Sequence, residues 1–447
     1  MTISPDEIKS GPNKGSITKK LTASFSGQIG IFLFGFISQV ILANGLGVDG
    51  KGTFSLVLLI VTLIFQFSHG SLSSANAHYT GRFPKNAAGI IGNSFIIAIV
   101  MGGILTWIVI GQSERILPKL YPQVDTQLVR LAIISLTALF LLEYCNSIVR
   151  GQNRIARFSF TLAARELLFV IIIMILFATD TFTVKNSLMG WLVIIIVISL
   201  YAFWSAWSGM KFQMKPDYKL WKSMASFSAK AHTANLSSFL RMRLDMFILA
   251  YFLDVKTVGY YSVSFAIVQF LSFLPKSVGQ VLGPHISWRK DSAGDALTPV
   301  LCRISLFLSV LSGFLLIVAG YFGIKLVFGV EFLPSYLPLI IMIPGAVVYT
   351  LATSLSGDLG GRGKPQYAMY ISLVMLVLNV GINLALIPTL GMVGAALSAS
   401  ITQAITGVLF LWAFLRESKV PVLSAILIRR EDFSVILKAV RKSSGVG

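Results

Sequence analysis

Charged residues are scarce in this chain of 447 residues: only 12% are Asp, Glu, Lys or Arg, whereas 55% are hydrophobic. A soluble domain carries about 25% charged residues, so this composition argues against a stable water-soluble fold. The apolar residues lack amphipathic spacing and come in runs of about 20, each long enough to cross a bilayer as a helix. The mean hydropathy of +0.79 is typical of a protein that crosses the membrane many times.

Cysteines are few and enzyme signatures are missing. The two cysteines, Cys145 and Cys302, form no CxxC pair and exclude a disulfide framework, so we expect two buried, inert thiols. No GxxxxGK phosphate loop, GxSxG elbow or HExxH pair occurs, and the four histidines lack metal-ligand spacing. We therefore predict that the protein is not an enzyme and has no catalytic residue, metal or cofactor.

The apolar runs predict an all-α membrane protein with twelve transmembrane helices. The segment before the first run is polar and lacks the short apolar core of a cleaved signal peptide, so we expect the first span to direct insertion. The predicted spans are 23–43, 54–77, 87–111, 128–148, 156–178, 187–209, 226–252, 258–283, 303–328, 335–356, 366–388 and 392–415.

The positive charges predict the orientation of these spans, because Lys and Arg are retained on the cytoplasmic side. With the N-terminus inside, 25 of the 37 Lys and Arg residues fall in cytoplasmic segments and seven fall outside, among them Lys51. Both termini are therefore predicted to be cytoplasmic, in a protein of the cytoplasmic (inner) membrane. Since this topology accounts for most of the net charge of +19, we predict no nucleic-acid partner.

The two halves of the sequence resemble each other. Ile41-Leu42-Ala43 recurs as Ile248-Leu249-Ala250, and Gly52-Thr53-Phe54-Ser55 recurs as Gly259-Tyr260-Tyr261-Ser262 at the same offset of 207 residues. A unit of six spans has an even number of crossings, so two such units have the same orientation, with the repeat axis along the membrane normal. The sequence thus predicts two six-helix lobes related by a parallel internal repeat.

The predicted domain boundaries follow from this repeat. Residues 1–210 form the N-terminal lobe, 211–225 a cytoplasmic linker, 226–416 the C-terminal lobe and 417–447 a cytoplasmic tail. In the tail, the apolar residues have the i, i+3, i+4, i+7 spacing of a helix, with cations opposite them. This pattern predicts an amphipathic helix on the inner leaflet, and its apolar residues are Phe433, Ile436, Leu437 and Val440.

Ionisable residues inside the spans indicate the candidate site, because such groups are costly unless they face a water-filled cavity or one another. At 100° per residue, each of the spans 156–178, 226–252 and 258–283 has a polar stripe with at least one cation. Three cationic stripes predict a lined cavity. The candidate substrate-binding residues are Arg165, Arg241, Asp245, Lys276, Arg154, Arg157 and Glu143.

Structural pairing is the alternative interpretation for the central residues. Arg241 and Asp245 are four residues apart and can neutralise each other on one helix. If this pair is closed when the cavity is empty, an arriving anion competes for Arg241, and the pair acts as a switch. Arg165 can pair with Glu143 or with Glu166.

The remaining cations also have structural alternatives. Lys276 can extend to the inner interface. Arg154 and Arg157 lie near an inner helix end, where they are topology signals before they are substrate contacts. Arg243 points away from Arg241 on the helix, which indicates a packing or interhelical pairing role.

Three segments resemble the Wzx-type polysaccharide flippases of the multidrug/oligosaccharidyl-lipid/polysaccharide exporter superfamily. They are the seventh and eighth spans from Arg241 to Ser262 (RMRLDMFILAYFLDVKTVGYYS), the turn Gly47 to Ser55 (GVDGKGTFS) and the segment Asn379 to Ser398 (NVGINLALIPTLGMVGAALS). Arg241 and Asp245 stand where these flippases have the Arg and Asp of the seventh span. The chain departs from the pattern at Asn44, where relatives often have an arginine.

This resemblance implies two lobes around a cavity that opens alternately to each side. It also implies a function, the flipping of a polyprenyl-pyrophosphate-linked oligosaccharide from the inner to the outer leaflet for cell-surface polysaccharide biosynthesis. The implied partners are this substrate, membrane lipids and, further along the pathway, a polysaccharide polymerase and other assembly proteins.

Three alternatives remain open at this stage. A multidrug extruder generally has an acid in the first span, where this chain has only neutral polar residues such as Gln39. A peptidoglycan-precursor flippase usually has an arginine in the first span and additional C-terminal spans. A membrane-embedded glycosyltransferase or polymerase usually has a larger outer loop than the connection 112–127.

Overall fold

The computed structural model describes residues 14–208, 218–287, 293–361, 364–418, 421–429 and 431–432. These residues are helical apart from short connections, as expected where a bilayer offers the backbone no water as a hydrogen-bonding partner. The chain divides into two compact units, Met1–Leu236 and Ser237–Gly447. The division falls within one helix, α8 (Tyr218–Phe252). The predicted linker 211–225 lies partly outside the described residues.

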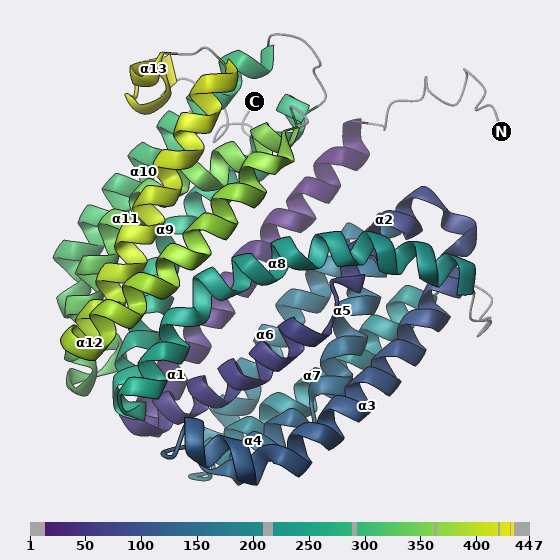
Figure 1. Ribbon diagram of the computed structural model, residues 1–447, viewed down its shortest axis with the longest axis vertical. Helices are drawn as coiled ribbons and strands as arrows, with labels where there is room; N and C mark the ends of the chain where they lie inside the picture. The colour runs from purple at the N-terminus through teal and green to yellow at the C-terminus, as the bar shows by residue number, and fades with distance from the viewer. Residues whose placement is uncertain are drawn as a thin grey trace. The chain divides into compact units, whose positions relative to one another are not determined.

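The first unit contains α1 (Lys14–Ser68), α2 (Leu72–Arg82), α3 (Ala87–Leu120) and α4 (Thr126–Ile133), followed by α5 (Leu136–Gly151), α6 (Ile155–Ala178), α7 (Val184–Trp207) and the beginning of α8 (Figure 1). Local signals in the sequence start some of these helices. The Thr183 hydroxyl accepts a hydrogen bond from the backbone N–H of Asn186 (3.1 Å) at the start of α7. Asp125 caps α4 in the same way.

The second unit contains the rest of α8, α9 (Val255–Ser287), α10 (Ala293–Gly323), α11 (Tyr336–Gly361), α12 (Pro365–Ser418) and the short α13 (Val422–Ile426). A π-helical turn at Ile324–Phe328 and a 3-10 helix at Val330–Ser335 connect α10 to α11. Helices α11 and α12 approach each other closely. A Cβ on Gly345 would lie 2.2 Å from the carbonyl oxygen of Ser400, so only glycine fits there.

Glycines interrupt the two longest helices. Gly47 in α1 has φ 66° and Gly391 in α12 has φ 59°, in the left-handed region that glycine adopts without a steric cost. In each case the kink separates two of the predicted spans. The second half of α1 then ends at Ser68, where left-handed Gly70 and Ser71 break the helix, so the predicted span 54–77 is not continuous.

Eight helical stretches of the described residues are long and apolar enough to cross a membrane. Two of them, Gly27–Ser68 and Gln366–Ser418, contain the glycine kinks, and each overlaps two predicted spans. Helices α8 and α9, which carry the predicted spans 226–252 and 258–283, are not among the eight. The chain is therefore an all-α, multi-pass membrane protein, whereas the number twelve and the two-lobe repeat stay predictions.

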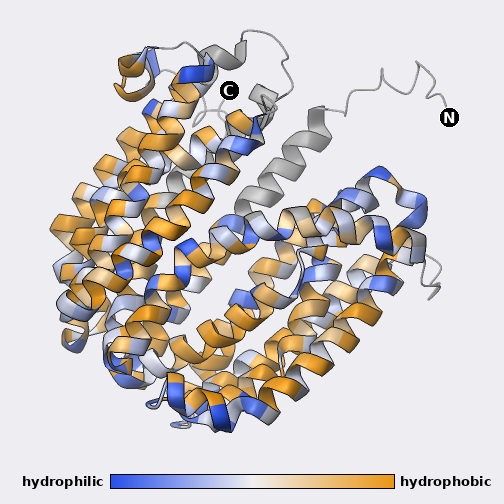
Figure 2. Ribbon diagram, viewed as in Figure 1, coloured by the Kyte–Doolittle hydropathy of each residue, from blue (hydrophilic) through white to orange (hydrophobic). Residues whose placement is uncertain are grey.

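Large apolar side chains face outwards as well as inwards. Trp107, Phe322 and Val377 are 78%, 71% and 73% exposed, which is costly in water and favourable in lipid. Figure 2 shows hydrophobic residues along most of the length of the helices, with hydrophilic residues gathered near helix ends and connections. This distribution agrees with helices that cross a bilayer.

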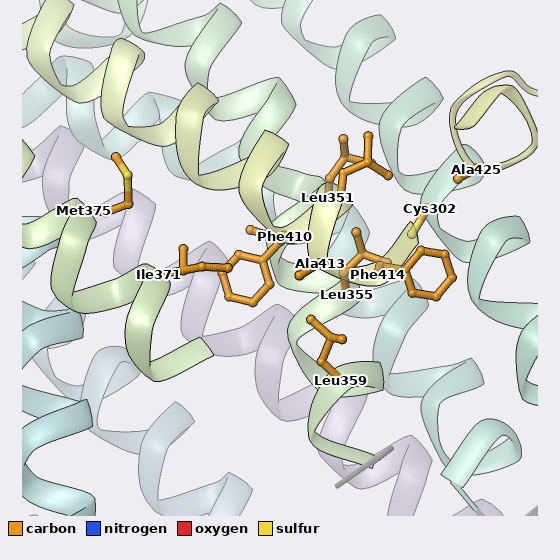
Figure 3. Packing of buried hydrophobic residues seen from close by; sticks show 12 residues of the cluster. Cys302, Leu351, Leu355, Leu359, Ile371, Met375, Phe410, Ala413, Phe414 and Ala425 are labelled. Carbon is orange, nitrogen blue, oxygen red and sulfur yellow. The ribbon is translucent and has the colours of Figure 1, made fainter. Parts of the chain in front are cut away.

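The core of the second unit follows from helical spacing. Leu351, Leu355 and Leu359 lie four residues apart on α11, so they share one face of that helix. They pack against residues from α10, both halves of α12 and α13 (Figure 3): Cys302, Ile371, Met375, Phe410, Phe414 and Ala425. Cys302 is buried here and Cys145 is buried in the first unit, as predicted for inert thiols.

Candidate functional site

Arg241 is the candidate cation of the second unit. It lies on α8, half-buried, and its Nη2 donates a hydrogen bond to the phenolic oxygen of Tyr349 on α11 (2.9 Å). Its guanidinium also lies 5.2 Å from the centre of the Tyr349 ring, a cation–π contact. The Nε atom is buried without a hydrogen-bond partner. Among the described residues, Arg241 contacts no carboxylate, so no acidic side chain there neutralises its charge.

Asp245 does not pair with Arg241, and the predicted pair is therefore wrong in this structure. Asp245 is buried, 4% exposed, and its Oδ2 accepts a short hydrogen bond from the phenol of Tyr261 on α9. Its Oδ1 accepts from the backbone N–H of Met246 at 2.9 Å. A spacing of four residues allows an ion pair, but the neighbouring helix supplies a donor that holds the carboxylate against α9.

Arg243 has the packing role that its direction on the helix indicates. Its guanidinium lies 4.7 Å from the centre of the Phe265 ring on α9. Its Nη1 also lies 3.8 Å from the sulfur of Met246. Arg243 therefore joins α8 to α9, whereas Arg241 joins α8 to α11.

In the first unit, Arg165 takes one of its two predicted partners. Its Nε and Nη2 donate to Oε1 of the adjacent Glu166 at 3.0 and 2.5 Å. Glu143, the other predicted partner, is exposed on α5 and joins no ion pair with a described residue. The charge of Arg165 is therefore balanced locally, in contrast to that of Arg241.

Arg154 and Arg157 bind the end of a neighbouring helix. Arg154 donates to the backbone carbonyl oxygens of Ser205 and Ser208, both at 2.8 Å, where α7 ends. Arg157 donates to the Ser208 hydroxyl at 3.1 Å and lies over the Trp204 ring. Helix C-termini leave carbonyl groups unpaired and carry partial negative charge, so these two cations stabilise α7.

Lys276 lies on α9, but its side chain is outside the described part of the structure, as is the predicted amphipathic helix of the tail. Sequence reasoning counted Lys51 among the cations outside the membrane and did not include it in the candidate site. Lys51 is 1% exposed. Its Nζ donates to Oε1 of Gln39 at 2.5 Å and to the Ser55 hydroxyl at 3.2 Å. Glycines on both sides, Gly50 and Gly52, are the one signal in the sequence that indicates close packing there.

The second unit also has a polar network between the two halves of α12. Asn379 donates to the Thr402 hydroxyl at 3.2 Å, and Asn383 donates to Oδ1 of Asn379 at 3.1 Å. All three residues are buried.

In the described ranges, no three His, Cys, Asp or Glu side chains come together as metal ligands. The described cations, amides and hydroxyls can bind and hold charged or polar groups.

The sequence matches a protein family and several known proteins. The family model described as "Polysaccharide biosynthesis protein" matches residues 17–288. The chain is 24% identical over 204 residues to a probable low-salt glycan biosynthesis flippase, Agl15, of Haloferax volcanii; the match covers 44% of this chain and 42% of that protein. The chain thus spans less than half the length of that relative. It is 22% identical over 403 residues to a putative O-antigen transporter of Shigella flexneri, with 85% and 93% covered.

Among solved structures, the lipid II flippase MurJ in an inward closed conformation has the same fold. Its TM-score is 0.74 at 16% identity, over 91% of this chain and 89% of that chain. These relatives are named as flippases or transporters, which supports the prediction that the chain is not an enzyme. The chain belongs to the family of polysaccharide biosynthesis proteins, and its resemblance to the Wzx-type polysaccharide flippases is confirmed.

Proposed function

We propose that this protein flips a polyprenyl-pyrophosphate-linked oligosaccharide from the inner to the outer leaflet of the cytoplasmic membrane. The environment of Arg241 is the observation that supports the proposal. It is a permanent cation on a helix of the second unit, and no described carboxylate neutralises it. A guanidinium offers several donors in a fixed plane, the geometry that binds phosphate oxygens best.

The contacts of Arg241 suit a ligand of this kind. Tyr349 holds one nitrogen of the guanidinium and the face of its ring supports the plane, while Nε remains without a partner. A buried donor without a partner is costly, and an anionic ligand would satisfy it when it binds. Arg165 is the secondary contact in this proposal, because a ligand has to compete there with Glu166.

The mechanism is alternating access between two six-helix lobes, without a chemical step. One observation supports the repeat on which this mechanism rests. The kink at Gly47 in the first unit and the break between α8 and α9 at Asp254 in the second differ by the same 207 residues as the sequence repeat. Binding energy drives such a cycle only if the substrate binds the two states with different affinity.

A flipping assay tests the proposed function. The purified protein is placed in vesicles with a fluorescent polyprenyl-pyrophosphate oligosaccharide, and a glycosidase added outside digests the glycans that reach the outer leaflet. We expect digestion of the inner pool only when the protein is present, whereas in protein-free vesicles digestion should stop once the outer leaflet is consumed. Equal digestion of the glycans in vesicles with and without the protein would contradict the proposal.

The topology is a second prediction: the distribution of cations predicts that both termini are cytoplasmic. A reporter that is active only outside the cytoplasm should be inactive when fused after Val446 and active when inserted at Gln123, in the connection between α3 and α4. Activity after Val446 would invert the orientation and reject the proposed direction of transport.

A further inference from the structure

Lys51 is an ionisable group that the proposed transport site does not use. It lies on α1 just after the kink at Gly47, and it is 1% exposed. Its partners are Gln39, on the half of α1 before the kink, and Ser55, one turn further along its own half. The bond to Gln39 therefore spans the kink and joins the two halves of α1.

Carboxylates are missing from the described contacts of Lys51. Its own helix offers Asp49, which is exposed. The helices packed against α1 in the first unit are α4, α5, α6 and α7, and their charged groups have other partners or are exposed. These groups are Arg130 (paired with Glu114), Glu143, Arg150, Arg157 (bonded to Ser208), Arg165 with Glu166, and Lys185.

Both protonation states of a lysine fit this site. The ammonium form donates to Gln39 Oε1 and to the Ser55 hydroxyl. The neutral amine still donates to Gln39 and uses its lone pair to accept from the Ser55 hydroxyl, since a hydroxyl can donate as well as accept. Burial without a counter-ion raises the free energy of a charged amine relative to the neutral one, so exchange between the two forms becomes accessible.

We propose that Lys51 is a reversible proton-binding site, and that its proton strengthens the bond across the α1 kink. If Lys51 binds a proton reversibly, protonation is coupled to the conformational change of the transporter. This consequence rests on the proposed transport function. The ammonium releases one proton to water and becomes the amine, and no other bond is broken. On the predicted topology, Lys51 lies at the outer side of the membrane, so it exchanges protons with the outer aqueous phase.

The first experiment measures the proton directly, without substrate. The protein is labelled with lysine carrying ε-¹⁵N and titrated in detergent by NMR, and Lys51→Arg identifies the Lys51 signal by its loss. We expect Lys51 to bind its proton at least about tenfold more weakly than exposed Lys185. Titration of Lys51 together with Lys185 would overturn the proposal.

The second experiment tests the coupling. The rate of the flipping assay is measured against the outer pH for the wild type, Lys51→Met, Lys51→Arg and the matched control Lys185→Met. We expect the wild type and the control to share one pH dependence, and both Lys51 variants to lose it. Gln39→Leu, which keeps the lysine but removes the bond across the kink, should lose it too.

The outcomes separate this inference from the proposed function. A Lys51→Met protein that transports with the wild-type pH dependence would overturn the coupling role. A wild-type protein that transports nothing at any pH would refute the proposed function, whereas the NMR result would still decide whether Lys51 is a proton site.

Discussion

Flipping per folded molecule is expected to fall about tenfold to a hundredfold when Arg241 is replaced by alanine, because charge-assisted hydrogen bonds contribute about 1.5–3 kcal/mol each. The loss in rate per molecule arises from the contact between guanidinium and head group. Loss of the contact with Tyr349 lowers the amount of folded protein separately, and dividing the rate by that amount removes this effect. Arg241→Lys keeps the charge but loses the planar fork, and we expect an intermediate rate. The rate is measured in the flipping assay and divided by the amount of folded protein.

Arg243 provides the matched control, since it is a cation on the same helix two residues away that packs over Phe265. Arg243→Ala should lower the amount of folded protein and leave the rate per molecule near that of the wild type. Arg165→Ala should have a smaller effect than Arg241→Ala, and the double variant the largest. Wild-type export by a folded Arg241→Ala, Arg165→Ala protein would end the assignment of both residues.

Asp245→Asn distinguishes the two roles proposed for the aspartate. A switch that closes on Arg241 predicts tighter binding of the head group and slower turnover in this variant. The observed bonds from Tyr261 and Met246 predict less folded protein and an unchanged rate per molecule, because the carboxylate supports the contact between α8 and α9. Tight binding with slow turnover would restore the switch.

Breaking the ion pair between Arg303 and Asp432 is expected to destabilise the second unit by about 3–5 kcal/mol. The pair is bidentate, with distances of 2.7 and 2.6 Å, and the side chains are only 6% and 2% exposed. Arg303 also donates to the carbonyl oxygen of Ser424, so one α10 side chain holds the segment that contains α13. Arg303→Met leaves a buried carboxylate without its partner, which causes the loss.

The test compares thermal midpoints of unfolding in detergent. Arg303→Met and Asp432→Asn should each lower the midpoint strongly, whereas Arg303→Met with Asp432→Leu should recover much of the loss, since no charge remains buried. Glu114→Gln is the control, because Glu114 of the Arg130–Glu114 pair is 71% exposed and this pair should contribute less than about 1 kcal/mol. Midpoints unchanged in the single variants would show that the pair is dispensable.

The pH dependence of this pair has a defined sign. Desolvation acts to raise the pKa of Asp432, but hydrogen bonds from Arg303 and from the backbone N–H of Arg429 outweigh it, and the pKa is lowered. A carboxyl group whose pKa is lower in the folded state contributes stability above its unfolded pKa and loses it as the pH falls through the folded value. The pair therefore stabilises the tail fully at neutral pH.

The sequence by itself determined the helices and the membrane, because apolar runs of about 20 residues leave the backbone no alternative in lipid. It also determined the family, through helix-end and glycine patterns such as Gly47 to Ser55, and the burial of both cysteines. These features depend on residues close together in the chain. Helical spacing even indicated correctly that Arg243 points away from Arg241.

Only the tertiary structure decided which partner each buried polar group takes. Spacing on α8 made Arg241 and Asp245 neighbours, but Tyr349, 108 positions away, binds the first, and Tyr261, 16 positions away, binds the second. No local pattern indicated Asp432, which is 129 positions from Arg303, and only the flanking glycines Gly50 and Gly52 indicated the burial of Lys51. Periodicity fixes the face of a helix on which a side chain lies, whereas its energy depends on the donors and acceptors that other helices bring to that face.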